Sequence, residues 1–288
     1  MWGCCVELKD VVNKDRSTGS LVKLRVVDII GKSKISKAFV SPDTRLVEVR
    51  KIIRDEALRS IAVVDSDRKL IGIITRGSVL SVASSKSEAM ASSVAEPPMV
   101  ILRPDVTLGE AIKSMLKADE WASPVVDSNG RFLGFLTFDD IVQLMINCCA
   151  ENLKSVSVSD VMSTNVVAVS EEDFISKIWN RIRELRYAGL PVVDSSGRLV
   201  GMITQYDLIA KGYSRIHLES EGGASRGPRV KDVMSRSVTY LYPWSSLYEV
   251  ASLMAKHSYG RVPIVNNSKE LKLVGIVDRE DVVKSLAR

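Results

Sequence analysis

The sequence predicts an α/β (α+β) fold made of four copies of one β-α-β-β-α unit, paired into two modules with pseudo-twofold symmetry. The main observation is a sequence motif that occurs four times. It consists of an apolar strand ending in Asp or Asn, a turn, and a second apolar strand with one glycine. A Thr or Asp stands three positions after that glycine in every copy. The copies are Ile61–Asp65 with Leu70–Thr75, Ser123–Asp127 with Phe132–Thr137, Leu190–Asp194 with Leu199–Thr204, and Val262–Asn266 with Leu273–Asp278.

Each element of the unit has its own signal. Turn residues between the two strands, such as Asp127–Gly130 and Asp194–Gly197, predict a hairpin. The helix before the hairpin starts at a capping box in two copies, Thr107 with Glu110 and Ser246 with Glu249. Its apolar residues then recur at helical spacing, as in Ile175, Ile178, Trp179, Ile182 and Leu185. A second helix follows the hairpin.

The strands are apolar on consecutive positions, so both faces of each sheet are expected to be covered, and one small copy would bury too little surface alone. The expected connectors are residues 82–93, 146–157 and 219–228. We therefore predict a basic segment at 1–24, repeats at 25–85, 92–150, 156–213 and 229–288, and modules at 25–150 and 156–288.

Charge and cysteine content suggest little specialised chemistry. Residues 1–37 hold eight Lys or Arg against four acids, which accounts for four of the five net positive charges. This segment could contact nucleic acid, although a solvated arm has the same composition. No membrane span or signal pattern is visible, so a cytoplasmic protein is expected. The adjacent pairs Cys4-Cys5 and Cys148-Cys149 are expected to be buried or incidental thiols, with a disulfide between the pairs as the alternative.

In these motifs the chain resembles the CBS-domain family, named for cystathionine β-synthase. The matching elements are Asp-Val-Met at 160–162 and 232–234, the Leu-Pro-Val-Val-Asp strand at 190–194, and the Gly-x-hydrophobic-Thr strand followed by Thr-x-x-Asp. The resemblance covers roughly residues 24 to 288 and extends to gamma subunits of AMP-activated protein kinase and to stand-alone archaeal CBS proteins. It implies two modules packed as a disc, with clefts between paired copies that bind adenosine-containing ligands.

The residues at the start of the last helix suit such a ligand. An ionised Asp can accept hydrogen bonds from both ribose hydroxyls, and a Thr at a helix start adds a hydroxyl to free backbone N–H groups that favour phosphate. Thr204 with Asp207 and Thr137 with Asp140 have this arrangement. The same pattern is also a capping box that needs no ligand, and both roles can coexist.

The other two copies differ from this pattern. Copy one has Thr75 and Ser78, and so lacks the carboxylate. Copy four has Asp278 and Asp281, which keeps the ribose acid but adds a negative charge where a phosphate would approach. That cleft should disfavour polyphosphates and suit adenosine, methylthioadenosine or S-adenosylmethionine. Arg261, two residues before Pro263, could compensate, and it is the one basic residue at its position among the four copies.

The resemblance also implies walls for the adenine ring. They are expected from the segment after Asp-Val-Met, with Thr164 and Val166, and from the strand residues Met202 and Ile203. Apolar residues at these positions would equally serve a hydrophobic core.

We therefore expect a non-catalytic sensor that binds AMP, ADP, ATP, S-adenosylmethionine or methylthioadenosine and signals to a regulated protein partner. A homodimer is a further form that such a sensor could take. Neither histidine lies in a catalytic motif, and no phosphate loop or metal-ligand cluster is present in the sequence, so no enzyme activity, catalytic cofactor or metal is expected. The alternatives are a structural or interaction subunit with vestigial clefts, or nucleic-acid binding through the basic amino-terminal segment.

Overall fold

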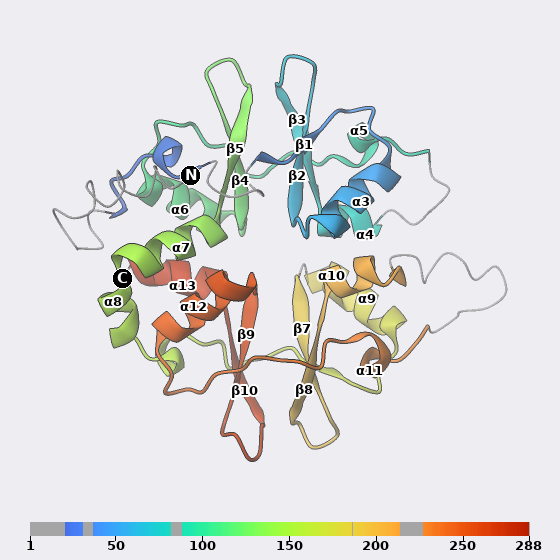
Figure 1. Ribbon diagram of the computed structural model, residues 1–288, viewed down its shortest axis with the longest axis vertical. Coiled ribbons are helices and arrows are strands. Elements are labelled where there is room, and N and C mark those ends of the chain that lie inside the picture. Colours follow the sequence, from blue (N-terminus) through green and yellow to red (C-terminus); the bar gives the residue numbers. More distant parts are fainter. Residues whose placement is uncertain (1–20, 31–36, 82–87, 186, 214–226, 288) are drawn as a thin grey trace.

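The computed structural model describes residues 21–30, 37–81, 88–185, 187–213 and 227–287, and in this part of the chain the four predicted copies are present. Residues 1–20 of the predicted basic segment 1–24, with Cys4-Cys5, lie outside the described residues, as do half of the connector at 82–93 and most of the one at 219–228. Figure 1 shows two modules facing each other, with the hairpins at the two outer ends and helices along the middle. The predicted α/β fold of paired repeats in a disc is confirmed.

The first module contains copies one and two. Copy one consists of β1 (Phe39–Val40), α3 (Leu46–Asp55), β2 (Ser60–Val64), β3 (Leu70–Thr75) and α4 (Arg76–Ser81). A short turn of 3-10 helix (Val26–Asp28) precedes it. Copy two consists of α5 (Ala91–Val94), α6 (Leu108–Lys117), β4 (Ala122–Val126), β5 (Phe132–Thr137) and α7 (Phe138–Cys148), and α8 (Ala150–Ser155) leads to the second module.

The second module repeats this order. Copy three begins with a 3-10 turn (Val158–Asp160) and continues through β6 (Val169–Ser170), α9 (Ile175–Leu185), β7 (Gly189–Val193), β8 (Leu199–Thr204) and α10 (Gln205–Ala210). Copy four consists of α11 (Val230–Val233), α12 (Leu247–His257), β9 (Arg261–Val265), β10 (Leu273–Asp278), α13 (Arg279–Lys284) and a final 3-10 turn (Ser285–Ala287).

The predicted hairpins form with one common register. Each is an antiparallel pair with a shift near its tip, and the first strand of copies one and three adds in parallel to the hairpin's inner strand. In the turns, Asp127 and Asp194 accept hydrogen bonds from backbone N–H groups at 2.8–2.9 Å, and Gly130 and Gly197 adopt positive φ, which favours glycine. The two hairpin tips of a module also bond to each other, as in Phe132 N to Arg68 O at 2.8 Å.

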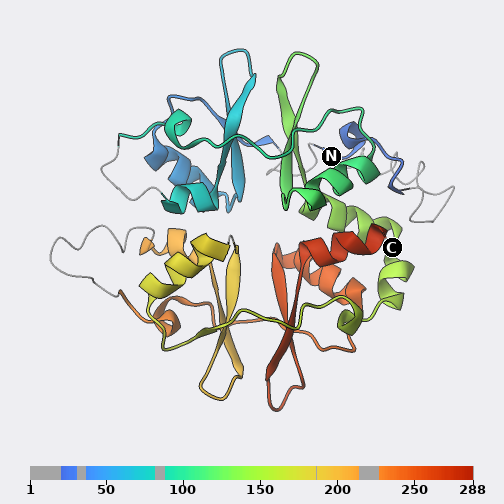
Figure 2. The ribbon, with the colours of Figure 1, turned by 180° about the vertical axis from the view of Figure 1, so that it is seen from behind.

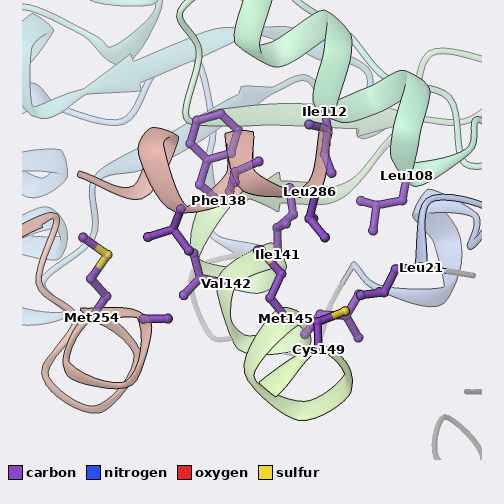
Figure 3. Packing of buried hydrophobic residues seen from close by; sticks show 14 of the residues in the cluster. Leu21, Leu108, Ile112, Phe138, Ile141, Val142, Met145, Cys149, Met254 and Leu286 are labelled. Carbon is purple, nitrogen blue, oxygen red and sulfur yellow. The ribbon is translucent and has the colours of Figure 1, made fainter. Parts of the chain in front are cut away.

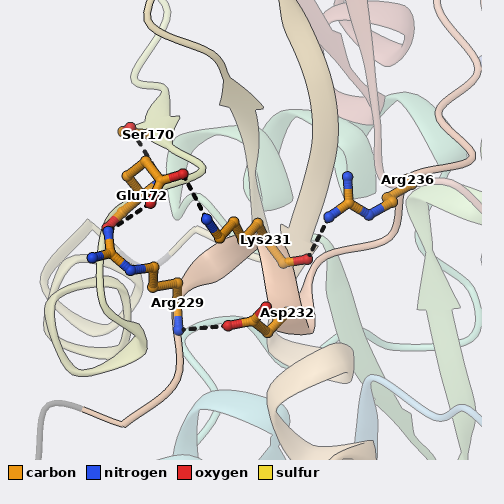
Figure 4. Close-up of polar contacts among 6 residues, drawn as sticks. All are labelled: Ser170, Glu172, Arg229, Lys231, Asp232 and Arg236. Atoms are coloured by element: carbon orange, nitrogen blue, oxygen red, sulfur yellow. Dashed lines mark hydrogen bonds and ion pairs between the residues drawn. The ribbon is translucent and has the colours of Figure 1, made fainter.

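The segment that opens each copy packs on the other copy of its module. Val158 N donates to Ser245 O at 2.9 Å, and Val230 N donates to Asp173 O at 2.8 Å, so copies three and four exchange their opening segments. Figure 4 shows the polar contacts that dock α11 on copy three, where Glu172 accepts from Arg229 Nη1 at 2.6 Å and from Lys231 Nζ at 2.8 Å. Two copies are therefore interlocked, not merely adjacent.

The hydrophobic cores run across the module boundary. One core joins copies two and four with residues 21–29, and a second joins copies one and three. Figure 3 shows part of the first, where Met145 and Cys149 of copy two lie near Leu21 and where Leu286 comes from copy four. Cys148 and Cys149 are free thiols, half-buried and buried, and burial raises the pKa of Cys149 to about 11. Seen from behind in Figure 2, the same helices again meet along the middle of the disc.

Candidate ligand-binding site

All four copies line one cavity of about 630 Å³ at the middle of the disc. This volume lies within the range of about 300–1,000 Å³ that is typical of small-molecule sites. The lining residues from the first module are Glu56, Ala57, Arg59, Arg76, Asp139, Asp140 and Gln143. The second module contributes Ala188, Gly189, Met202, Thr204, Tyr206, Asp207, Ser235, Ser237–Thr239, Met254, Ala255, His257–Arg261 and Pro263.

Thr204 and Asp207, the strongest sequence candidates, both face this cavity at the start of α10. They form a capping box: Thr204 N and Oγ1 donate to Asp207 Oδ2 at 2.8 and 2.5 Å, and Asp207 N donates to Thr204 Oγ1 at 3.1 Å. These hydrogen bonds of the Asp207 carboxylate use Oδ2, and both residues are half-buried. The capping role is therefore present, in a position where Asp207 can also meet a ligand.

The apolar wall beside this helix start differs from the expected one. Met202 faces the cavity, and its backbone pairs with Ser235 through two N–H to O bonds of 2.9 Å. The neighbouring wall is therefore the segment 235–239 of copy four, with Val238 and Thr239. This arrangement follows directly from the exchange of opening segments.

Three of the predicted wall residues lie elsewhere. Ile203 is fully buried in the core of copies one and three, because alternate residues of a strand face opposite sides. Thr164 and Val166 follow Ser163, which pairs with Ile276 of copy four at 2.9–3.0 Å. Neither Thr164 nor Val166 lines the cavity that Met202 faces, so the role of these two residues as adenine walls stays a prediction.

Arginines from copies one and four lie together at the cavity. Arg261 is present as predicted, with Nη1 donating to Gly189 O at 2.9 Å and its guanidinium 4.4 Å from the ring centre of Tyr187. Arg59 and Arg76 of copy one also line the cavity. Arg279, the first residue of α13, is 5% exposed and lies beside them.

Backbone carbonyl groups hold these arginines at the ends of two helices. Arg76 donates to Ala57 O and Leu58 O at 2.5 and 2.7 Å, after the last turn of α3. Arg59 Nη2 and Arg279 Nη2 both donate to Ser258 O, the C-cap of α12, at 2.8 and 3.1 Å. The negative end of a helix dipole favours such cations.

The described ion pairs of the cluster involve two of its four arginines, although Glu56, Asp140 and Asp207 also line the cavity. Arg279 forms an ion pair with Asp139, and Arg261 Nη2 lies 3.8 Å from Asp278 Oδ2. Burial is the main cause that lowers the pKa of Arg59 to about 9 and that of Arg76 to about 10, and the charge of Arg279 contributes to both shifts. Burial thus disfavours the charged form of these two arginines, and a nearby anionic group would favour it.

Gly260 lies directly against this cluster. A Cβ on Gly260 would lie 2.7 Å from Arg279 Nη1 and 2.9 Å from Arg59 Nη1, closer than side-chain atoms can approach. Sequence reasoning missed Arg59, Arg76 and Arg279. One signal was available, because Arg76 and Arg279 each follow the first helix-start residue of their copy.

The cleft of Thr137 and Asp140 reaches the same cavity only in part. Thr137 is 2% exposed and forms a capping box with Asp140, with Oγ1 to Oδ2 at 2.6 Å, whereas Asp140 lines the cavity.

The cleft of copy four has the two acids that the sequence predicts. Asp278 accepts from the N–H groups of Glu280 and Asp281 at 2.9 and 3.2 Å, and Asp281 Oδ2 accepts from Asp278 N at 2.9 Å. Burial, followed by the charge of Asp278, raises the pKa of Asp281 to about 7. Neither residue lines the central cavity.

The described chain shows neither a metal site nor a spanning helix. Within the described residues, no group of three or more His, Cys, Asp or Glu side chains is placed to bind a metal ion. None of the helices in those residues is both long and apolar enough to cross a membrane.

Known proteins share this architecture. The solved structure of MJ1225 from Methanocaldococcus jannaschii, described as a proposed archaeal homologue of γ-AMPK, is 22% identical, covers 91% of this chain and 99% of its own, and superposes with a TM-score of 0.78. MJ1404 of the same organism is 27% identical over 255 residues, and this chain spans 59% of its length. The CBS domain pair of MJ0100, solved with 5′-methylthioadenosine and S-adenosyl-L-methionine, is 26% identical over 46% of this chain, with a TM-score of 0.38.

The match to a family model covers all four copies. The model of the CBS domain matches residues 28–85, 91–147, 158–213 and 230–288, which together make up most of the chain. The chain therefore belongs to the CBS-domain family.

Proposed function

We propose that this protein is a non-catalytic regulatory subunit that binds an adenosine-containing ligand in the central cavity and signals its presence to a protein partner. The observation that carries the proposal is the continuity of the cavity. A single space joins the helix start at Thr204 and Asp207, the apolar wall at Met202 and Val238, and a group of arginines.

The nucleoside part of the ligand fits the side of copy three. Asp207 can accept hydrogen bonds from the two ribose hydroxyls, because the capping contacts described for its carboxylate use Oδ2. An adenine ring would lie between Met202 and Val238, with Ala188 and Pro263 as further apolar surface. The backbone of segment 235–239 would supply the edge contacts that distinguish one base from another.

The phosphate part of the ligand fits the part of the cavity that the arginines line. Arg59, Arg76 and Arg261 present guanidinium groups that carbonyl groups hold in place, so little side-chain entropy would be lost on binding. Arginine binds phosphate through parallel N–H to O bonds, and these are about twice as strong as bonds between neutral groups. The ligands that we propose are AMP, ADP or ATP, with S-adenosylmethionine and methylthioadenosine as candidates for the cleft of Asp278 and Asp281.

A regulatory role follows from the position of the cavity between the modules. A ligand held by Asp207 of the second module and Arg76 of the first would contact both, so its binding energy would depend on how the modules pack. A partner protein that contacts both modules could respond to that packing. The regulated partner and a possible homodimer are part of this proposal.

Calorimetric titration of the ligand-stripped full chain tests the proposal directly. We expect binding of at least one of AMP, ADP, ATP, S-adenosylmethionine and methylthioadenosine, and loss of at least tenfold in affinity in Asp207→Ala. Asp232→Ala is the matched control, since Asp232 caps α11 through Arg229 N at 3.2 Å but does not line the cavity. Flat titrations with all five compounds would instead favour a structural subunit with vestigial clefts.

A further inference from the structure

Asp139 is the acidic side chain that joins the two modules inside the cavity. It is the second residue of α7 in copy two, it lines the cavity, and its Oδ1 accepts from Nε of Arg279 in copy four. The side chain of Arg279 is 6% exposed and that of Asp139 is 27% exposed. The carboxylate is therefore open to the cavity while its partner is buried.

The charge of Asp139 acts on three of the cavity arginines. Burial lowers the pKa values of Arg59, Arg76 and Arg279, and the negative charge of Asp139 opposes this effect at each of them. Arg59 and Arg279 also share Ser258 O as an acceptor, so these two guanidinium groups lie next to each other. Asp139 thus occupies the place of an anion at the cluster to which we assign ligand phosphates.

The repeated fold does not require an acid at this position. Counting from the first helix-start residue, the equivalents of Asp139 are Gly77, Tyr206 and Glu280, and Glu280 pairs with Lys284 of its own helix. The capping box of α7 uses Thr137 and Asp140, not Asp139. Copies two and four thus carry an acid at this position, and of these two acids Asp139 lines the cavity and Glu280 does not.

On the basis of the proposed function, we infer that Asp139 is a specificity-determining residue that competes with ligand phosphate for the central arginines. An incoming phosphate meets the repulsion of the Asp139 carboxylate and arginines that are partly neutralised by it. An adenosine ligand without phosphate meets neither. Asp139 thus lowers the affinity for nucleotides relative to uncharged adenosyl compounds and limits how many phosphate charges the cavity accepts.

The test compares one phosphorylated and one uncharged probe in the full chain. Calorimetry with AMP and with 5′-methylthioadenosine is carried out on the wild type, on Asp139→Asn and on Glu172→Gln. Glu172→Gln is the matched control, because it removes one negative charge that pairs with Arg229 and Lys231 outside the cavity. Circular dichroism checks that Asp139→Asn folds. If it does not, the variant Asp139→Ser, which removes the same charge, is used in its place.

We expect Asp139→Asn to bind AMP about tenfold more tightly or better, with methylthioadenosine changed less than twofold and Glu172→Gln like the wild type. The gain should shrink as salt is raised. If Asp139→Asn changes the affinity for both probes equally, or weakens AMP binding, the inferred role of Asp139 is overturned while the proposed function stands. A wild type that binds neither these two probes nor the other adenosyl compounds would overturn the proposed function, and this inference with it.

Discussion

The side chain of Met234 occupies the space that a Cβ on Gly201 would need. The sulfur and Cγ of Met234 both lie against this position, with Cγ 3.0 Å from it. Met162 lies against Gly275 in the same way, with its Cγ at 3.2 Å. The methionine of each Asp-Val-Met segment thus packs on the hairpin glycine of the other copy in its module, which explains why copies three and four contain both residues.

Gly201→Ala should therefore destabilise the protein by about 1–3 kcal/mol, because the added methyl group overpacks the contact with Met234. Chemical denaturation followed by circular dichroism measures this change. Gly77→Ala is the matched control, since its Cβ would meet the nearest atom, Thr75 Oγ1, at 3.4 Å and the residue lies in helix α4. It should be neutral or stabilising by about 0.5–1 kcal/mol. Equal losses in both variants would contradict the interlocking role of the glycine.

A comparison of two cap residues separates capping from ligand binding. Thr204→Ala and Ser246→Ala each remove a side-chain acceptor for the N3 amide, of α10 and α12 respectively, so each should cost about 1 kcal/mol of stability. Thr204 lines the cavity and Ser246 does not. Only Thr204→Ala should also weaken AMP binding in calorimetry. If Thr204→Ala binds AMP as tightly as the wild type, Thr204 caps helix α10 but does not bind the ligand.

Much of the fold could be predicted because its signals are local. Turn residues, capping boxes and the helical spacing of Ile175, Ile178 and Trp179 each lie within a few residues of the element they specify, and these three side chains are at most 8% exposed. Leu185, at the end of that pattern, is 38% exposed, because α9 ends there. The pair Thr204 and Asp207 was accessible for the same reason, since one turn of helix contains the motif.

The rest depended on contacts between copies, which a local pattern does not contain. Nothing in residues 158–163 indicates that this segment pairs with copy four, so no local signal separates Thr164 and Val166 from Met202. The arginine cluster forms from Arg59, Arg76, Arg261 and Arg279, which come from copies one and four at positions that are only partly equivalent. Its existence follows from the packing of one module on the other.

The raised pKa of Asp281, about 7, predicts an unusual pH dependence of stability. Between pH 4 and 7 the folded state holds a proton on Asp281 that the unfolded state, with a pKa of 3.8, has released. Stability should therefore fall as the pH rises through this window and level off above it. Asp281→Asn should remove this slope and stabilise the protein by about 1–2 kcal/mol at pH 8, less than the full shift implies, because solvent and Lys284 screen the charge. Denaturation curves at pH 4 to 8 measure this, with the exposed Glu151→Gln as control; a slope that survives in Asp281→Asn contradicts the assignment.

Substitution of two arginines of the cluster, Arg279 and Arg59, should affect protein stability to very different extents. Arg279→Gln leaves the carboxylate of Asp139 without its ion-pair partner in a partly buried site, so it should destabilise the protein by about 3–5 kcal/mol. Arg59 has no carboxylate among its described hydrogen bonds and is repelled by Arg279, so Arg59→Gln should keep stability within about 1 kcal/mol of the wild type. It should nevertheless weaken AMP binding at least tenfold while sparing methylthioadenosine. Thermal unfolding and calorimetry on both variants measure these effects. A strongly destabilised Arg59→Gln would make this arginine a structural residue, because its charge would then be compensated within the protein itself.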